Sequence, residues 1–197
     1  MSSSPHVVPA RFRFGRDPES DLAQPPVVHA DELMLRRWYR LHDRDRTLAR
    51  AELELLVEDM SAHPELWRHL VHHSPDERHY LPMLLDANVE IWLICWCPTQ
   101  ETGFHDHGGS RGAVAVLQGT LSETLPYIGG EHPRALHRTG DCFSFGSAHI
   151  HDVQPAGGAP AASLHAYSPP LGEMGFYELD DGGTLTRRPG DSDDEFC

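Results

Sequence analysis

Two histidines one residue apart, His105 and His107, are the residues of this chain whose type and spacing point most directly to chemistry. In an extended strand the side chains of residues i and i+2 project from the same face, so both imidazoles can reach one metal ion. A third histidine on a neighbouring strand would complete a facial set that leaves coordination positions open for a substrate and dioxygen. The pair therefore predicts a metal centre.

Two histidines further along the chain, His149 and His151, can supply the third ligand. They also lie at i and i+2, and periodicity alone does not choose between them. One alternating pair would be weak support, because such histidines also occur on solvated strand faces. Two pairs, each beside glycines in a β-rich segment, favour metal binding.

The segments that would carry these histidines read mainly as β-strands. Residues 89–96 are apolar at alternating positions on both faces, which predicts a buried strand. Because glycines, prolines and aspartates separate the later candidates at close intervals, the pattern indicates an antiparallel sandwich or barrel rather than β-α-β units. The later candidates span residues 112–117, 121–127, 141–145, 161–167 and 175–179.

The chain upstream of the strands has a different character. Residues 1–30 contain several prolines and no sustained periodicity, so we expect a flexible N-terminal arm. Apolar residues between Leu33 and Met60 predict one or two amphipathic helices, and Pro64 stands where a further helix can begin. We expect a single domain over residues 31–185 and a disordered acidic tail over residues 186–197.

Composition excludes several classes of protein. Thirty acidic residues against sixteen basic ones give a formal net charge of −14, which disfavours a nucleic-acid partner. No apolar run of about 18 residues is present, so no membrane span is expected. The N-terminus lacks a basic segment followed by an apolar run, and we expect a cytoplasmic monomer or small homo-oligomer. The cysteines show no metal-binding spacing and are interpreted mainly as buried free thiols.

Several motifs, in order, resemble those of one known family. GFHDHGGSRGAVAVLQG (residues 103–119) resembles the first cupin motif, and GDCFSFGSAHIHDVQP (residues 140–155) resembles the second. With LQGTLSET (117–124) and SLHAYSPP (163–170), the chain is similar to the cysteine dioxygenase (thiol dioxygenase) family of cupins. The resemblance implies a mainly β fold, a cupin double-stranded β-helix forming a small jelly-roll-like barrel, with an N-terminal helical segment.

The resemblance also implies a metal and its ligands. The acidic ligand of other cupins would fall near Arg111 or Gly112 and is absent, as in thiol dioxygenases, which hold Fe(II) with three histidines. The matching residues are His105, His107 and His151, for one Fe(II) per chain. His151 is preferred because it precedes Asp152-Val153, as the family ligand does, and His149 is the alternative. Three neutral ligands leave the iron its full charge, which favours an anionic thiolate.

A second set of residues, Ser163, His165 and Tyr167, alternates along one expected strand. In the family this row is hydrogen-bonded and the tyrosine hydroxyl reaches the iron pocket, so a role in oxygen chemistry is implied. Some members carry a cysteine at the position of Gly112, joined covalently to the tyrosine. Glycine cannot form that bond, and no Cys–Tyr crosslink is expected.

The substrate position departs from the family. Cysteine dioxygenases carry a carboxylate-binding arginine two residues after a tyrosine, whereas this chain reads Tyr80-Leu81-Pro82. Arg78, Tyr80 and Arg111 are the remaining candidates for substrate contact. The resemblance implies a thiol dioxygenase that oxidises a small thiol, cysteine or a related mercapto compound, to its sulfinic acid with O2. The alternatives are a cupin dioxygenase of another substrate class and a non-catalytic metal-binding cupin.

Overall fold

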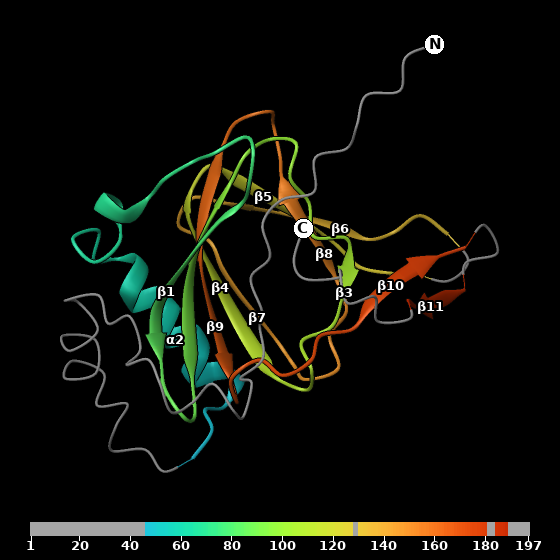
Figure 1. Cartoon of the computed structure of the whole chain (residues 1–197), viewed down its shortest axis with the longest axis horizontal. Helices are drawn as coiled ribbons and strands as arrows, with labels where there is room; N and C mark the ends of the chain where they lie inside the picture. Colours follow the sequence, from blue (N-terminus) through green and yellow to red (C-terminus); the bar gives the residue numbers. More distant parts are fainter. Residues whose placement is uncertain (1–45, 128–129, 181–183, 189–197) are drawn as a thin grey trace.

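A computed structural model describes residues 46–127, 130–180 and 184–188 of the chain, and Figure 1 shows its β-rich architecture. The described elements, in chain order, are α2 (Arg50–Ser61), the short 3-10 helix η3 (Arg68–Leu70), β1 (His79–Leu85), β2 (Glu90–Trp96), β3 (Phe104–His105), β4 (Arg111–Gln118), β5 (Thr120–Thr124), β6 (Arg134–Arg138), β7 (Cys142–Phe145), β8 (Asp152–Pro155), β9 (Ala161–Ser168), β10 (Phe176–Leu179) and β11 (Leu185–Arg187). The expected flexible arm lies outside the described residues.

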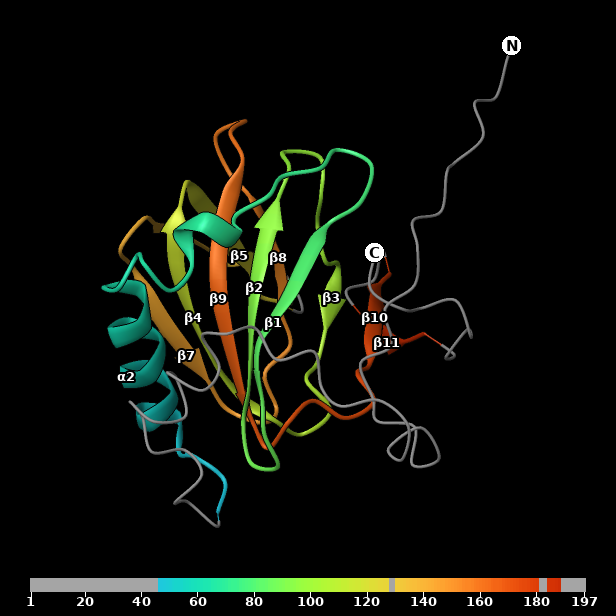
Figure 2. The same ribbon diagram turned by 60° about the vertical axis from the view of Figure 1, so that its left-hand side comes forward.

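A five-stranded antiparallel sheet, in the order β1-β2-β9-β4-β7, forms the centre of the molecule. Helix α2 packs on one face of this sheet, and the smaller sheets lie beyond the other face (Figure 2). Both faces are therefore covered, which is why every residue of β2 and of β9 is buried. The buried strand expected over residues 89–96 is confirmed as β2.

The alternation of side chains along β2 divides the core in two. Ile91 and Leu93 join the cluster under α2, together with Leu53 and Val57. The intervening side chains face the barrel interior, where Trp92, Ile94 and Trp96 pack with Val114, Phe145, Val153 and Tyr167. The interior layer is the one that contains the candidate site.

Helix α2 accounts for part of the predicted helical segment. Leu53, Leu56, Val57 and Met60 are buried at helical spacing, and the side chain of Glu52 accepts a hydrogen bond from the backbone N–H of Ala49. The residues expected to be helical before residue 46 lie outside the described part.

The further helix predicted to begin at Pro64 is wrong. The chain there forms turns followed by the single 3-10 turn η3. The apolar pattern arose from burial rather than from helicity, since Leu66 and Trp67 both belong to the core.

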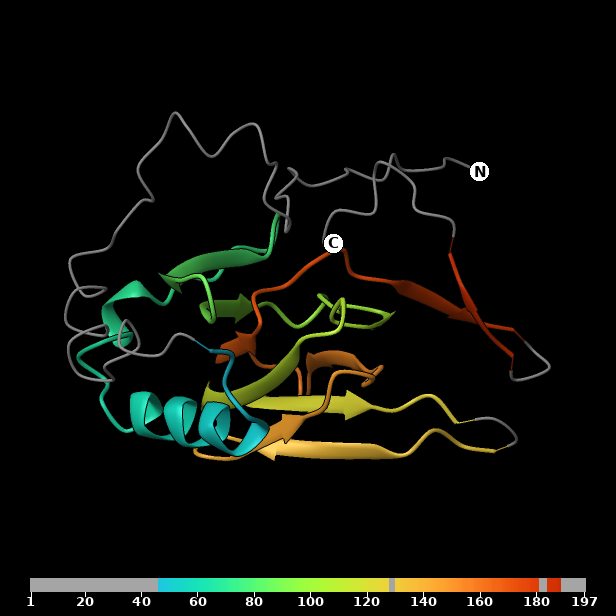
Figure 3. The ribbon, with the colours of Figure 1, turned by 90° about the horizontal axis from the view of Figure 1, so that it is seen from below.

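Two three-stranded sheets complete the barrel, in the orders β6-β5-β8 and β11-β10-β3. The hairpins β5–β6 and β10–β11 extend on the same side of the molecule (Figure 3). Strand β6 was not predicted, because it is largely exposed and has no apolar alternation. Strand β11 crosses the expected domain boundary at residue 185, while residues 189–197 lie outside the described part.

The mainly β double-stranded β-helix with an N-terminal helical segment is thus confirmed. Cys95, Cys97 and Cys142 are free thiols, and the first two are buried in the sheet as expected. In the described ranges no helix combines the length and the apolar character needed to cross a membrane.

Candidate metal centre and adjoining pocket

Three histidines meet at the edge of the barrel interior and form what we call the histidine triangle, made of His105, His107 and His151. His105 at the end of β3 and His151 just before β8 lie opposite each other, since the N–H of each donates to the carbonyl of the other at 3.0 and 3.2 Å. His107 follows in the turn that leads to β4. The three ring centroids lie 4.9 to 5.0 Å apart, and one ligand atom from each histidine lies within 4.8 Å of the others.

In both His105 and His151 a hydrogen bond occupies Nδ1 and leaves Nε2 available to bind a metal. Nδ1 of His105 donates to the carbonyl of Gly103 at 3.0 Å, and Nδ1 of His151 donates to Oε1 of Glu123 at 2.8 Å. Both ring nitrogens of His107 are buried and find no hydrogen-bond partner in the described part of the chain. Orphaned buried nitrogens destabilise a fold unless something binds them. Three converging imidazoles therefore fit a divalent transition metal, which would bind one of the two unpaired nitrogens of His107.

Burial keeps these histidines neutral. It lowers the pKa of His105 to about 3, with a further contribution from the neighbouring His151. Burial likewise lowers the pKa of His107 and of His151 below the ordinary histidine value. Neutral imidazole is the form that binds a metal, so the site needs no proton to be displaced at neutral pH.

Glu123 on β5 organises the outer side of this cluster and was missed from the sequence. Its Oε1 accepts hydrogen bonds from Nδ1 of His151 and, at 2.9 Å, from Nε2 of His149, while its Oε2 accepts from Nε2 of His137 at 3.1 Å. Burial raises the pKa of the Glu123 carboxyl, but the bonds from His149 and His151 outweigh it and lower that pKa overall. The structure thus places His151 in the triangle and directs His149 to the carboxylate.

Asp106, which lies between His105 and His107, holds this part of the chain through hydrogen bonds on the outer side of the site. Oδ1 of Asp106 accepts hydrogen bonds from the backbone N–H groups of Gly108 and Gly175, and Oδ2 accepts from the hydroxyl of Tyr177 at 2.7 Å. Gly108 has a φ of +59°, and a Cβ there would lie 2.9 Å from the carbonyl oxygen of Glu173. These contacts hold Asp106 on the outside of the chain segment that joins His105, at the end of β3, to the buried His107.

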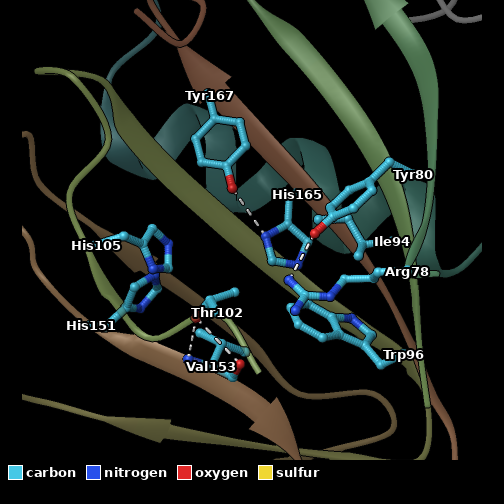
Figure 4. Close-up of a pocket in the computed structure, with 10 residues that line it drawn as sticks. All are labelled: Arg78, Tyr80, Ile94, Trp96, Thr102, His105, His151, Val153, His165 and Tyr167. Carbon is cyan, nitrogen blue, oxygen red and sulfur yellow. Dashed lines mark hydrogen bonds between the residues drawn. The ribbon is translucent and has the colours of Figure 1, made fainter. Parts of the chain in front are cut away.

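The row expected on β9 is present as a chain of hydrogen bonds. Oγ of Ser163 lies 2.8 Å from Nε2 of His165. Nδ1 of His165 lies 3.2 Å from the hydroxyl of Tyr167, a contact drawn in Figure 4. At the far end Nε1 of Trp96 donates to Oγ of Ser163 at 2.9 Å. Burial lowers the pKa of His165 to about 3 and raises the pKa of Tyr167 above its ordinary value.

A small pocket joins this row to the histidine triangle. Its volume is about 290 Å³ including the open mouth. His105 and His151 line one side, and Arg78 lies on the other side beside Trp96 (Figure 4). The remaining lining residues are Tyr80, Ile94, Thr102, Val153, His165 and Tyr167.

Arg78 is the substrate candidate that the structure brings into the pocket. Its side chain is 8% exposed, its Nη1 donates to the hydroxyl of Tyr80 at 2.7 Å, and its Nη2 donates to the carbonyl of Glu101. The guanidinium carbon lies 4.6 Å from the centroid of the Trp96 ring. Because Arg78 and Tyr80 are two residues apart in extended chain, they share a face.

Tyr80, the second substrate candidate, also lines the pocket, whereas Arg111 and Pro82 do not. Arg111 is the exposed first residue of β4, where it pairs with Ser168. The prediction that Arg111 contacts the substrate is therefore wrong. Pro82 lies in β1 opposite Trp92, next to an irregularity in the strand pairing, and does not line the pocket either. The basic residue that lines the pocket is thus Arg78, two positions before Tyr80, rather than a residue at position 82, two positions after it.

Only a glycine fits at position 112, because the ring of Phe145 on β7 lies directly against it. A Cβ at this position would lie 2.2 Å from Cζ and 2.4 Å from Cε2 of Phe145. The Phe145 ring packs against His107 in a tilted arrangement with centroids 4.4 Å apart, and Gly112 also pairs with Tyr167. An aromatic ring thus fills the space in which a cysteine side chain would approach Tyr167.

The fold and the three-histidine cluster define a cupin with a candidate mononuclear metal centre. The family described as cysteine dioxygenase type I matches residues 40–179, and the chain belongs to this family. Cysteine dioxygenase type 1 of Danio rerio is 29% identical over 133 residues, which cover 61% of this chain and 65% of that protein. The Homo sapiens protein of the same name is 27% identical over 132 residues, with the same coverage of 61% and 65%.

Similar solved structures share less of the sequence. An uncharacterized conserved protein with a double-stranded β-helix domain from Klebsiella pneumoniae aligns with a TM-score of 0.46 at 17% identity, covering 54% of this chain and 90% of that one. A cupin superfamily protein from Desulfitobacterium hafniense aligns with a TM-score of 0.44 at 13% identity, covering 54% and 88%.

Proposed function

We propose that this protein is a thiol dioxygenase that converts a small thiol and O2 to the sulfinic acid, with both oxygen atoms retained in the product. The observation that carries the proposal is the buried triangle of His105, His107 and His151, because His105 and His151 line the pocket that Arg78 also lines. Membership of the cysteine dioxygenase type I family supports the same reaction class.

The proposed metal is one Fe(II), held by Nε2 of His105, Nε2 of His151 and a ring nitrogen of His107. When bound, it would supply adjacent open positions at which a thiolate and dioxygen can meet. The protein residues hold the reactants around that point. Tyr167 and His165 line the pocket beside the triangle, where the tyrosine hydroxyl can donate a hydrogen bond to a bound anionic group.

Arg78 supports a carboxylated thiol as the substrate. Burying a guanidinium without a carboxylate partner is costly, and no ion pair of Arg78 is found among the described residues. Its two hydrogen-bond acceptors, the Tyr80 hydroxyl and the Glu101 carbonyl, are neutral, and its Nε has no partner there. A substrate carboxylate would supply the missing charge, with the thiol directed toward the histidines on the opposite wall.

The pocket lining also indicates that a substrate amino group is not required for binding. None of the residues that line it is acidic, so no side chain there pairs with a substrate ammonium group. The pocket is small, since even with its open mouth it measures only about 290 Å³, and this favours a short ligand. We therefore propose that cysteine and short mercapto acids without an amine both serve as substrates.

Anaerobic titration of the iron-loaded protein with these thiols tests the proposal. A spectral change on adding thiol, followed by oxygen uptake equal to the sulfinate formed, is the expected result. His107→Ala is the matched negative control, because it removes a proposed ligand. Iron retention without oxygen uptake for any thiol would overturn the proposal and favour a non-catalytic metal-binding cupin.

A further inference from the structure

Trp96 stands at the buried end of the row formed by Ser163, His165 and Tyr167. Its ring is 1% exposed, and its Nε1 lies 2.9 Å from Oγ of Ser163. An indole N–H can only donate a hydrogen bond, whereas a serine hydroxyl can donate and accept. Trp96 therefore fixes which role the Ser163 oxygen plays, and this choice is passed along the row.

The direction of each later bond follows from that first one. Because Ser163 accepts from Trp96, its own proton is left for Nε2 of His165 at 2.8 Å. Nε2 then accepts, so the neutral ring carries its proton on Nδ1. That proton is donated to the hydroxyl oxygen of Tyr167 at 3.2 Å. Tyr167 accepts within the row, and its own proton is free to donate into the pocket.

The opposite direction would leave a buried proton without an acceptor. If Tyr167 donated to Nδ1, then Nε2 of His165 would donate to Ser163, which would receive two hydrogen bonds. The Ser163 hydroxyl is 0% exposed, and no other acceptor for it is found in the described part of the chain. Burying an unsatisfied donor is unfavourable, so the direction that begins at Trp96 is preferred.

We propose that Trp96 is a positioning residue that holds His165 in its Nδ1–H tautomer and thereby turns the Tyr167 proton toward the pocket. The tautomer is a property of the folded chain and does not depend on the proposed activity. Its consequence for catalysis does rest on the proposed thiol dioxygenase function. There Tyr167 would donate a hydrogen bond to an anionic sulfur or oxygen in the pocket, without giving up its proton within the row.

Trp96→Phe separates this role from the packing role of the same ring. Arg78 lies over the Trp96 ring, and phenylalanine retains an aromatic face for that cation while removing the N–H donor. Trp67→Phe is the matched control. Trp67 is buried in the other core cluster and donates to the carbonyl of Ser61, so it reports the effect of losing an indole elsewhere.

The test is ¹⁵N NMR of histidine-labelled, metal-free protein, with the His165 signals assigned by their loss in His165→Gln. We expect the Nδ1–H tautomer in the wild type and in Trp67→Phe. In Trp96→Phe the ratio of the two tautomers should shift by roughly fivefold toward Nε2–H, the equivalent of a net hydrogen bond of about 1 kcal/mol. An Nε2–H tautomer in the wild type would overturn the proposal, whether or not Trp96→Phe folds. An unchanged ratio in folded Trp96→Phe would also overturn it.

Turnover supplies the second readout. With equal iron content, Trp96→Phe should lower kcat several-fold and change KM little, since Arg78 and the histidine triangle remain in place. If no thiol is oxidised by any variant while the tautomer result holds, then the proposed function fails and the role of Trp96 in orienting the row stands.

Discussion

His105 and His151 face each other across two strands, joined by a reciprocal pair of backbone hydrogen bonds of 3.0 and 3.2 Å. This pairing fixes the separation of their rings before any ligand binds, because side chains directly opposite in antiparallel chains project from the same face. His107 then needs only the turn that Asp106 holds to complete the triangle. The cluster is thus preorganised by backbone pairing.

His151→Ala is expected to lose most of the bound iron, whereas His149→Ala should retain it. Nε2 of His151 points into the triangle, while Nε2 of His149 is bonded to Glu123. Metal content after desalting measures the difference, and thermal unfolding of the metal-free forms checks that both variants fold. Retention by His151→Ala with loss by His149→Ala would assign the third ligand to the other histidine.

Glu123→Gln should weaken iron binding by roughly ten- to a hundredfold, the usual effect of losing a carboxylate partner behind a ligating histidine. The amide keeps the shape of the side chain but removes the charge that orients Nδ1–H of His151. Competition with a chelator measures the affinity. Glu54→Gln is the matched control, because Glu54 accepts a hydrogen bond from Ser144 outside the metal cluster. Equal affinities for the two variants would contradict the role assigned to Glu123.

Side-chain alternation explains which parts of the site could be predicted. The period of two along β9 is local, so it places Ser163, His165 and Tyr167 on one face without knowledge of the fold. Glu123 depends on the pairing of β5 with β8, where it lies opposite Val153 and thereby reaches the neighbouring His151. No local pattern specifies such a register. The two faces of β2 were likewise predictable, because both are apolar.

Arg78 was one of the three substrate candidates named from the sequence, and the same alternation explains how it reaches the pocket. Arg78, Tyr80 and Pro82 are spaced by two and share one face, so the basic group can stand on either side of the tyrosine. The family pattern places its arginine at the later position, where this chain has Pro82, so the sequence alone did not choose among Arg78, Tyr80 and Arg111. The exposed strand β6 had no detectable signal, since polar residues on both faces give no periodicity.

Arg78→Met should raise KM for cysteine and for 3-mercaptopropionate by roughly ten- to a hundredfold, the effect of losing a charged hydrogen bond of about 1.5–3 kcal/mol. It should change little for 2-aminoethanethiol, which lacks a carboxylate. Initial rates of oxygen uptake measure both. Arg111→Met is the control and should behave as wild type, because Arg111 is exposed and outside the pocket. An equal loss for all three thiols would show that Arg78 does not bind the carboxylate.

The metal-free protein should lose stability as the pH falls from about 6.5 toward 3. Burial lowers the pKa of His105 and of His165 from 6.5 to about 3 in the folded state. Between these values the unfolded chain binds protons that the folded protein does not, so acidification favours unfolding. Above pH 6.5 these residues are neutral in both states and contribute no slope. Urea unfolding midpoints at several pH values measure the effect. If stability depends on pH equally steeply in His165→Gln, then His165 does not contribute to it.

Gly112→Cys should destabilise the protein by about 1–3 kcal/mol, the usual effect of overpacking a core. The new Cβ would collide with the ring of Phe145, which has little room to move because it packs against His107. Adding Phe145→Ala should relieve the collision, so the double variant should lose less stability than the two single changes predict together. Urea unfolding of the four proteins measures this coupling, and strict additivity would contradict the packing argument. In the wild type, mass analysis should find the Tyr167 peptide without a crosslink, because Phe145 and Gly112 together leave no thiol beside that ring.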